Sequence, residues 1–274
     1  LGERLIPQVE AMSKANRELT GPGEGGYGNL TAFGREELRG IGERNATRNA
    51  SLLDTIERDD LSVSFLTSGE DRATESGWYF GHGLLDGRGD LTDNLASGTT
   101  DGHVKLETRQ DLLYAHKDKK AESYKRYNEW KDSDVLEKKV QQAYDKPASR
   151  EAAEGLLRKI FAPEFIEAID SGNVQFTGTE KQDKTVEGIV DAALQFYNLY
   201  IISPAMEREE AKPAEGWIFD EYMDDASGPT FAYLLDVEDF YEKGPAIAGQ
   251  TVSYDNFEPL LDHMLEGVRQ RAEG

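Results

Sequence analysis

An arginine stands where a predicted strand ends and a helix begins, and this placement is suited to phosphate chemistry. Residues 61–67 alternate between apolar and polar side chains, which predicts a strand. Ser68 and Asp71 have the spacing of a helix cap, so a helix is expected from there to about Gly83. Arg72 then falls in the first turn of that helix, at the carboxyl end of the strand.

The predicted position of Arg72 favours a bound anion. Ligands of open α/β sheets gather at the carboxyl ends of strands, where helix N-termini supply unpaired amides. A cation in the first turn of a helix is unfavourable by about 0.3–1 kcal/mol. A phosphate bound to the guanidinium through two hydrogen bonds would offset this cost. The alternative is an ion pair between Arg72 and Asp71, Glu75 or another acid, since exposed pairs are common in acid-rich chains.

Most of the remaining chain is predicted to be helical. These helices are predicted from the helical spacing of apolar residues, from prolines at helix starts and from glycines at helix ends. They cover residues 3–19, 31–48 with Thr31 as N-cap, 107–130, 133–145, 149–161, 163–172, 185–201, 229–244 and 253–272. Residues 21–29 and 86–103 are rich in glycine and polar residues and predict loops. The last helix is expected to bury an apolar stripe formed by Leu260, Leu261, Met264, Leu265 and Val268.

The predicted strand at residues 61–67 has no predicted partner. A lone strand leaves its backbone groups unpaired, and even an isolated hairpin is marginally stable. Either weak strands escape this prediction, or the partner strands lie outside the 274 residues.

The composition excludes several functional classes. Hydrophobic residues make up 38 % and charged residues 31 %, as in globular proteins. No apolar run approaches the length of about 20 residues that spans a bilayer. The net charge of −22 argues against nucleic acid as a partner. Because charges are screened over about 8 Å, a local group of cations could still bind phosphate.

The histidines and cysteines indicate no metal site and no cysteine chemistry. The chain has no cysteine, and no histidine is four residues from another. His82 is expected at a helix end or in packing, and His263 at the boundary of the core. The histidines are His82, His103, His116 and His263.

Two blocks of sequence resemble the branch-two histidine phosphatases. The run TSGEDRATESGWYFGHGL over residues 67–84 resembles the motif in which a strand ends in Thr-Ser and an arginine follows. The run NLTAFGREELRGIGERNATRN over residues 29–49 resembles the helix upstream of that motif in the family. Weaker similarity continues through DLLYAHKDKKAESYKRY at 111–127, LLDVEDFYEKGPA at 234–246 and LLDHMLEGVRQ at 260–270. Within this family these runs resemble those of bacterial multiple inositol-polyphosphate phosphatases, or phytases.

The resemblance implies a fold and an activity. The fold class would be α/β plus α: a partial α/β sheet domain over residues 1–100 and 241–274, with a mainly helical cap domain over 101–240. The activity would be hydrolysis of phosphomonoesters such as phytate through a phosphohistidine, without cofactor or metal, in a secreted or cell-surface protein. Only Arg72 matches the family's phosphate clamp residue by residue. His116 and Lys117 are expected to bind substrate; a solvated basic helix face is the alternative.

The sequence departs from the family pattern in one important respect. The Arg-His-Gly motif of the nucleophile and the His-Ala-Glu motif of the proton donor are both absent. We therefore expect the 274 residues to be an internal segment of a longer protein and to be inactive alone. The alternatives are a pseudoenzyme, an acid phosphatase for other small phosphate esters, and a non-catalytic helical binding module on the same scaffold.

Overall fold

The computed structural model describes residues 2–21, 25–89, 104–114, 117–177 and 185–273. The chain forms two compact units. We call Leu1–Ser13, Lys125–Pro204 and Lys212–Asp255 the helical unit, and Lys14–Tyr124, Ala205–Ala211 and Asn256–Gly274 the sheet unit. The domain boundaries expected from the family resemblance stay a prediction.

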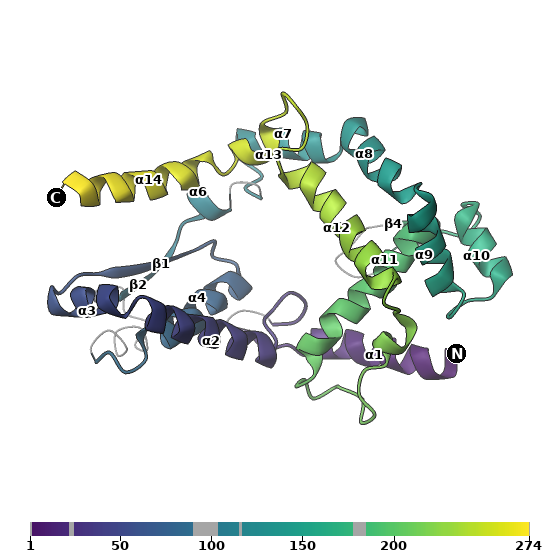
Figure 1. The fold of residues 1–274 in the computed structure, drawn as a ribbon, viewed down its shortest axis with the longest axis horizontal. Coiled ribbons are helices and arrows are strands. Elements are labelled where there is room, and N and C mark those ends of the chain that lie inside the picture. Colours follow the sequence, from purple (N-terminus) through teal and green to yellow (C-terminus); the bar gives the residue numbers. More distant parts are fainter. Residues whose placement is uncertain (1, 22–24, 90–103, 115–116, 178–184, 274) are drawn as a thin grey trace. The chain divides into compact units, whose positions relative to one another are not determined.

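The sheet unit is built on two parallel strands, β1 (Val63–Thr67) and β2 (Val104–Thr108), which pair in register from Val63 with Val104 to Thr67 with Thr108. Helix α4 (Asp71–Leu85) lies in the connection between them, as the crossover of a parallel pair requires (Figure 1). Of the two alternatives left open by the sequence, the first is therefore correct for this strand: a weak strand escaped prediction. The residues of β2 alternate between apolar and polar, but the run is only five residues long, and its end was predicted as the start of a helix over 107–130.

Helices α2 (Ala32–Arg48), α3 (Ala50–Arg58) and α4 enclose the core of the sheet unit. Its buried centre consists of Leu53, Leu85 and Val104, and the half-buried residues packed against it are Ala46, Ile56, Phe65, Trp78 and Leu84. Thr31 is the N-cap of α2 as predicted: its hydroxyl accepts a hydrogen bond from the Gly34 amide at 2.9 Å.

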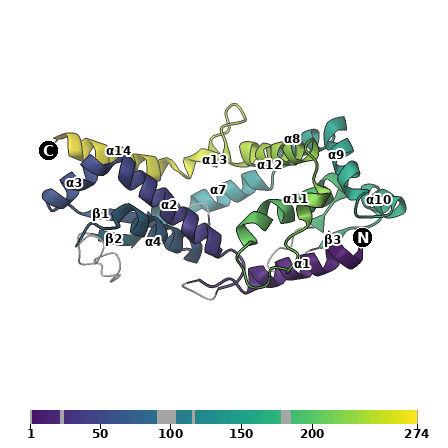
Figure 2. The same ribbon diagram turned by 60° about the horizontal axis from the view of Figure 1, so that its bottom comes forward.

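Helices α2 and α4 pack side by side through glycines (Figure 2). A Cβ atom on Gly83 would overlap the carbonyl oxygen of Arg39 on α2. A Cβ atom on Gly42 would overlap the carbonyl oxygen of Phe80 and come within 2.7 Å of the Leu84 amide nitrogen on α4. Backbone atoms inside helices cannot move aside singly, so both positions require glycine for this approach.

The start of α4 and the exposure of the last helix differ from the predictions. The N-cap of α4 is Glu70 and not Ser68. The Ser68 hydroxyl instead accepts a hydrogen bond of 3.4 Å from the Glu70 amide.

The last helix, α14 (Glu258–Glu273), contacts α6 (Gln110–Leu113). Of the stripe expected to be buried on α14, only Leu260 is half-buried; the other four residues are exposed, with fractions of 56 % for Leu261 and 69 % for Val268. Spacing reveals an apolar stripe but not whether a neighbour covers it.

The helical unit consists mainly of helices that pack on one another. Its elements, with helices that extend beyond it given in full, are α1 (Gly2–Arg17), α7 (Glu122–Lys131), α8 (Asp134–Tyr144), α9 (Pro147–Leu157), α10 (Pro163–Asp170), β3 (Phe176–Thr177), β4 (Thr185–Val186), α11 (Gly188–Ile202), η1 (Ser203–Met206), η2 (Phe219–Tyr222), α12 (Ser227–Lys243) and α13 (Val252–Asp255). Helix α9 packs on α11 and α12, and α12 also packs on α8. This core contains fully buried Leu156, Phe219, Phe231 and Leu234. The described helices include none with the length and hydropathy of a membrane span.

A buried acid links α7 to α12 in the helical unit. Glu242 is 7 % exposed, and one of its carboxylate oxygens accepts a hydrogen bond of 2.6 Å from the Tyr127 hydroxyl. The Trp130 indole donates to the Glu242 carbonyl at 3.0 Å. Burial raises the pKa of Tyr127, and the hydrogen bond to Glu242 raises it further. The hydroxyl therefore remains a donor to the carboxylate at neutral pH.

Replacing Gly83 by alanine tests the close packing of α2 and α4. Because the new methyl group would meet the backbone of Arg39, we expect Gly83→Ala to lower the free energy of unfolding by about 1–3 kcal/mol. The control is Gly267→Ala on exposed α14, where no atom lies within 4 Å. There alanine should be neutral or stabilise by up to about 1 kcal/mol. Equal effects of the two changes in urea denaturation would contradict the packing argument.

Removing the hydroxyl of Tyr127 tests the buried acid. Tyr127→Phe leaves the Glu242 carboxylate without this donor, so the free energy of unfolding should fall by about 1–3 kcal/mol at pH 7. The control is Tyr254→Phe, since Tyr254 is 42 % exposed. Because the folded state holds the Tyr127 proton more tightly than the unfolded chain, wild-type stability should decline as the pH rises above about 10. A Tyr127→Phe variant with the same stability and the same alkaline decline would contradict this assignment.

Candidate functional site

The carboxyl ends of β1 and β2 meet at one edge of the sheet. The register pairs Thr67 with Thr108 there, and the Arg109 amide donates a hydrogen bond of 2.8 Å to the Thr67 carbonyl. The Thr67 hydroxyl also lies 3.4 Å from the hydroxyl of Thr74 on α4. These contacts hold the strand ends and the first turns of α4 together.

Gly69 makes the sharp turn between β1 and α4. Its φ of +83° belongs to the left-handed region, which glycine adopts without strain. A Cβ atom here would also come within 2.8 Å of the Thr108 methyl carbon on β2. The turn therefore depends on glycine for both its conformation and its contact with the neighbouring strand.

Arg72 follows this turn and is exposed in the first turn of α4. Among the residues that the structure describes, its guanidinium forms no ion pair and no hydrogen bond. Glu75, one of the acids considered as its partner, lies against Arg35 instead, with 2.7 Å between Nε and Oε1 and exposed fractions of 11 % and 22 %. The helix N-terminus thus carries a guanidinium whose donors remain available to a ligand.

The glycine-rich loop before α2 lies against Arg72. Gly28 has a φ of +86°, and a Cβ atom built on it would sit 3.0 Å from Nη1 of Arg72. Asn29 stabilises the loop by donating a side-chain hydrogen bond of 2.9 Å to the Gly26 carbonyl. The glycine content predicted this loop but not its contact with Arg72, because glycines indicate a turn without indicating its neighbour.

Tyr114 lies near Arg72 and adds a polar group to the site. Its hydroxyl donates a hydrogen bond of 2.7 Å to a carboxylate oxygen of Glu70. This bond and then burial raise the pKa of Tyr114, whereas the charge of Arg72 acts in the opposite direction. The Lys117 ammonium lies 5.7 Å from the centroid of the Tyr114 ring. We call Gly28, Glu70, Arg72, Tyr114 and Lys117 the strand-end cluster.

The remaining candidates divide into those that the structure describes and those that it does not. Lys117 belongs to the strand-end cluster, while His116 lies outside the described residues, as does His103. Tyr114 and Glu70 had no signal of their own in the sequence, since a tyrosine before a basic run is not specific. Arg109 also lies near the sheet edge, but Asp111 binds it at 2.9 Å and 2.7 Å.

The two described histidines do not add a nucleophile to the strand-end cluster. His82 lies ten residues after Arg72 on α4, which corresponds to about 15 Å along the helix. Its ring packs 4.7 Å from that of Trp78, and burial lowers its pKa, as expected of a packing residue. His263 is exposed on α14, which corrects the prediction of a core-boundary position. Within the described ranges no three potential ligands form a group that could hold a metal.

Helix N-termini at the carboxyl ends of strands are where open α/β proteins commonly bind anionic ligands, and the strand-end cluster has this location. The chain belongs to branch 2 of the histidine phosphatase superfamily, whose family model matches residues 10–272. The predicted family and the predicted fold class, α/β plus α with a helical cap, are confirmed.

Solved structures of a Bifidobacterium longum multiple inositol polyphosphate phosphatase are similar to the chain. The complex with inositol hexasulfate has a TM-score of 0.82, the complex with phosphate 0.81 and the apo form 0.80, each at 29 % sequence identity. The similarity covers 99 % of this chain and 61 % of each of those chains. The chain thus spans less than two thirds of the length of these relatives. Comparison with curated proteins gave no match.

Binding of inorganic phosphate tests the site directly. Arg72→Ala should weaken phosphate binding to the 274-residue chain at least tenfold, because a charge-assisted hydrogen bond is worth about 1.5–3 kcal/mol. Arg48→Ala is the matched control, since Arg48 is an exposed arginine in the last turn of α2. Isothermal titration calorimetry at fixed salt measures both. Equal affinities for the two variants would mean that Arg72 contributes only net charge.

Proposed function

We propose that this chain forms part of a phosphatase that hydrolyses phosphomonoesters, and that Arg72 holds the phosphoryl group. The observation that carries the proposal is the guanidinium of Arg72, which stands at the strand ends without an ion-pair partner among the described residues. Membership of the histidine phosphatase superfamily supports it. An acid pairing with Arg72 would have supported the structural alternative instead.

In the proposed reaction, the protein supplies a histidine and a proton donor from outside the 274 residues, because the sequence contains neither motif. The histidine attacks phosphorus, a nitrogen–phosphorus bond forms, and the bond from phosphorus to the alcohol oxygen breaks. An acid protonates that oxygen. Water then breaks the nitrogen–phosphorus bond and releases phosphate. Arg72 stabilises the charge on the phosphoryl oxygens in both steps.

Inositol polyphosphates such as phytate are the proposed substrates. The similar Bifidobacterium longum protein was solved with inositol hexasulfate, in which sulfates replace the phosphates. A substrate with several phosphates needs cations beyond the clamp, and Lys117 is the described candidate beside Tyr114. We assign His116 the same role from its place next to Lys117 in the sequence.

The wider organisation is also a proposal. Residues 101–240 would form the helical cap over a phosphatase domain to which residues 1–100 and 241–274 contribute. Export to the cell surface or medium would match the family. Reading the coding sequence on both sides of the 274 residues tests this organisation.

An activity assay separates a complete enzyme from a partial one. The 274-residue chain alone should release no phosphate from phytate, since it lacks both motifs. The longer protein should release phosphate from phytate in preference to a simple ester such as p-nitrophenyl phosphate. In that protein Arg72→Ala should lower kcat by about 10²–10³ with an unchanged melting temperature. Turnover by the 274-residue chain, or full activity of the variant, would overturn the proposal.

A further inference from the structure

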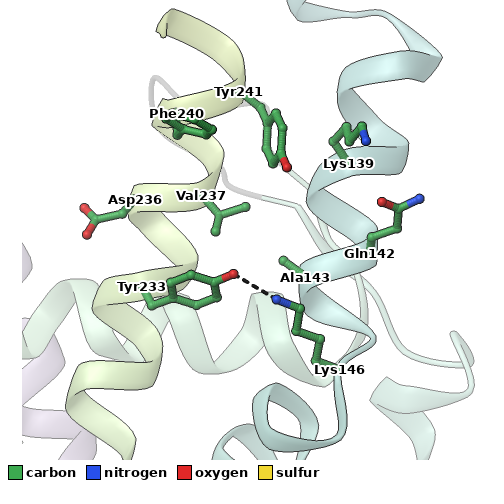
Figure 3. A pocket seen from close by; sticks show the side chains of 9 residues that line it. All are labelled: Lys139, Gln142, Ala143, Lys146, Tyr233, Asp236, Val237, Phe240 and Tyr241. Atoms are coloured by element: carbon green, nitrogen blue, oxygen red, sulfur yellow. Dashed lines mark hydrogen bonds between the residues drawn. The ribbon is translucent and has the colours of Figure 1, made fainter. Parts of the chain in front are cut away.

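A groove runs between α8 and α12 in the helical unit (Figure 3). It encloses about 460 Å³, which lies within the range of pockets for small organic ligands. One wall is formed by Lys139, Gln142 and Ala143 of α8 with Lys146 just beyond its end, and the other by Tyr233, Asp236, Val237, Phe240 and Tyr241 of α12. No residue of the strand-end cluster lines it.

Each lysine of the groove faces a tyrosine of the opposite wall. Lys146 donates a hydrogen bond of 2.9 Å from Nζ to the Tyr233 hydroxyl, and its ammonium lies 5.0 Å from the centroid of that ring. The Lys139 ammonium lies 5.8 Å from the centroid of the Tyr241 ring. The two cations are seven residues apart, so they mark two positions along the groove.

Neither lysine has a carboxylate partner within the part of the chain that the structure describes. Among the described residues, Asp236 is the only acid that lines the groove, and its carboxylate points away from both lysines (Figure 3). The protein has 53 acidic and 31 basic side chains, so acids are abundant relative to the lysines and arginines that they could pair with. The groove therefore offers positive charge to a ligand.

The remaining lining is largely apolar. Ala143 and Val237 form a buried floor, with exposed fractions of 4 % and 8 %. Two aromatic rings stand at the rim, with exposed fractions of 45 % for Tyr233 and 55 % for Phe240. Exposed aromatic rings around an apolar floor suit a ligand with a flat ring, because the ring would stack on them and its apolar surface would be removed from water.

We propose that this groove binds a small organic anion that carries a flat apolar ring. The acidic group binds at the ammonium group of Lys146, Lys139 adds positive charge farther along the groove beside Tyr241, and the ring packs on the floor against Tyr233 and Phe240. The hydroxyl of Tyr233 supplies a further hydrogen bond to the acidic group. An anion without a ring would not cover the apolar floor, and a neutral ring would not pair with the lysines. The ligand class is therefore an aryl carboxylate, sulfonate or phosphate.

Naphthalene-2-sulfonate is a suitable probe, and isothermal titration calorimetry on the 274-residue chain measures its binding. We expect saturable binding with one site. The neutral 2-naphthalenemethanol, which has the ring alone, and sulfate, which has the charge alone, should each bind at least tenfold more weakly. Equal binding of all three compounds, or no saturable binding of the sulfonate, would overturn the proposal.

Three variants place the binding in the groove. Lys146→Gln should weaken naphthalene-2-sulfonate binding roughly tenfold, which is the effect of losing one charge-assisted contact. Lys139→Gln should weaken it by less, about fivefold, because its charge acts from farther along the groove. The matched control is Lys138→Gln, since Lys138 is the exposed neighbour on α8 that does not line the groove. Its affinity should stay within about twofold of wild type, because one exposed charge contributes little. The melting temperature reports folding in each case. If Lys138→Gln weakens binding as much as the groove variants, the sulfonate responds to net charge and the proposed site is wrong.

Discussion

The backbone contact between α2 and α4 is the constraint on which the position of Arg72 depends. Gly42 and Gly83 let the two helices approach until a side chain at either position would overlap a carbonyl group of the other helix. Because α4 begins directly after β1, this contact also fixes the distance of its first turn from the strand ends. Gly69 adds the second constraint, since its left-handed turn lies against Thr108 of β2. Backbone geometry therefore positions the first turn of α4 and with it Arg72, which has no ion-pair partner among the described residues.

In a strongly acidic protein, a cation without an acidic partner is an indication of a site for an anionic ligand. With a net charge of −22, most cations can find an acid, as Arg35 does with Glu75 and Arg109 with Asp111. Arg72 stands apart from these pairs at a helix N-terminus, where a cation is unfavourable without an anion. Screening over about 8 Å leaves such a local site largely independent of the remote acids. An acidic protein can therefore hold a polyanion where a few cations converge.

Sequence patterns predicted those parts of the fold that depend on local chemistry. The strand at 63–67 and the helix after it were predicted from alternation and spacing, and the Thr31 cap from its side chain. The predictions failed where the outcome depends on distant neighbours. β2 is recognisable only beside β1, and the exposure of α14 depends on what packs against it. The placement of Arg72 was predictable from the strand–turn–helix order, whereas the contact of Gly28 with it joins segments that no local pattern connects.

The central claim is that Arg72 holds a phosphoryl group at the carboxyl ends of β1 and β2. Nitrogen-15 NMR of the arginine Nε–Hε groups during a phosphate titration tests it most directly. The resonance that disappears in the Arg72→Lys variant should be the one that shifts most and saturates in the wild-type chain. A titration in which that resonance stays in place while those of other arginines shift would contradict the claim.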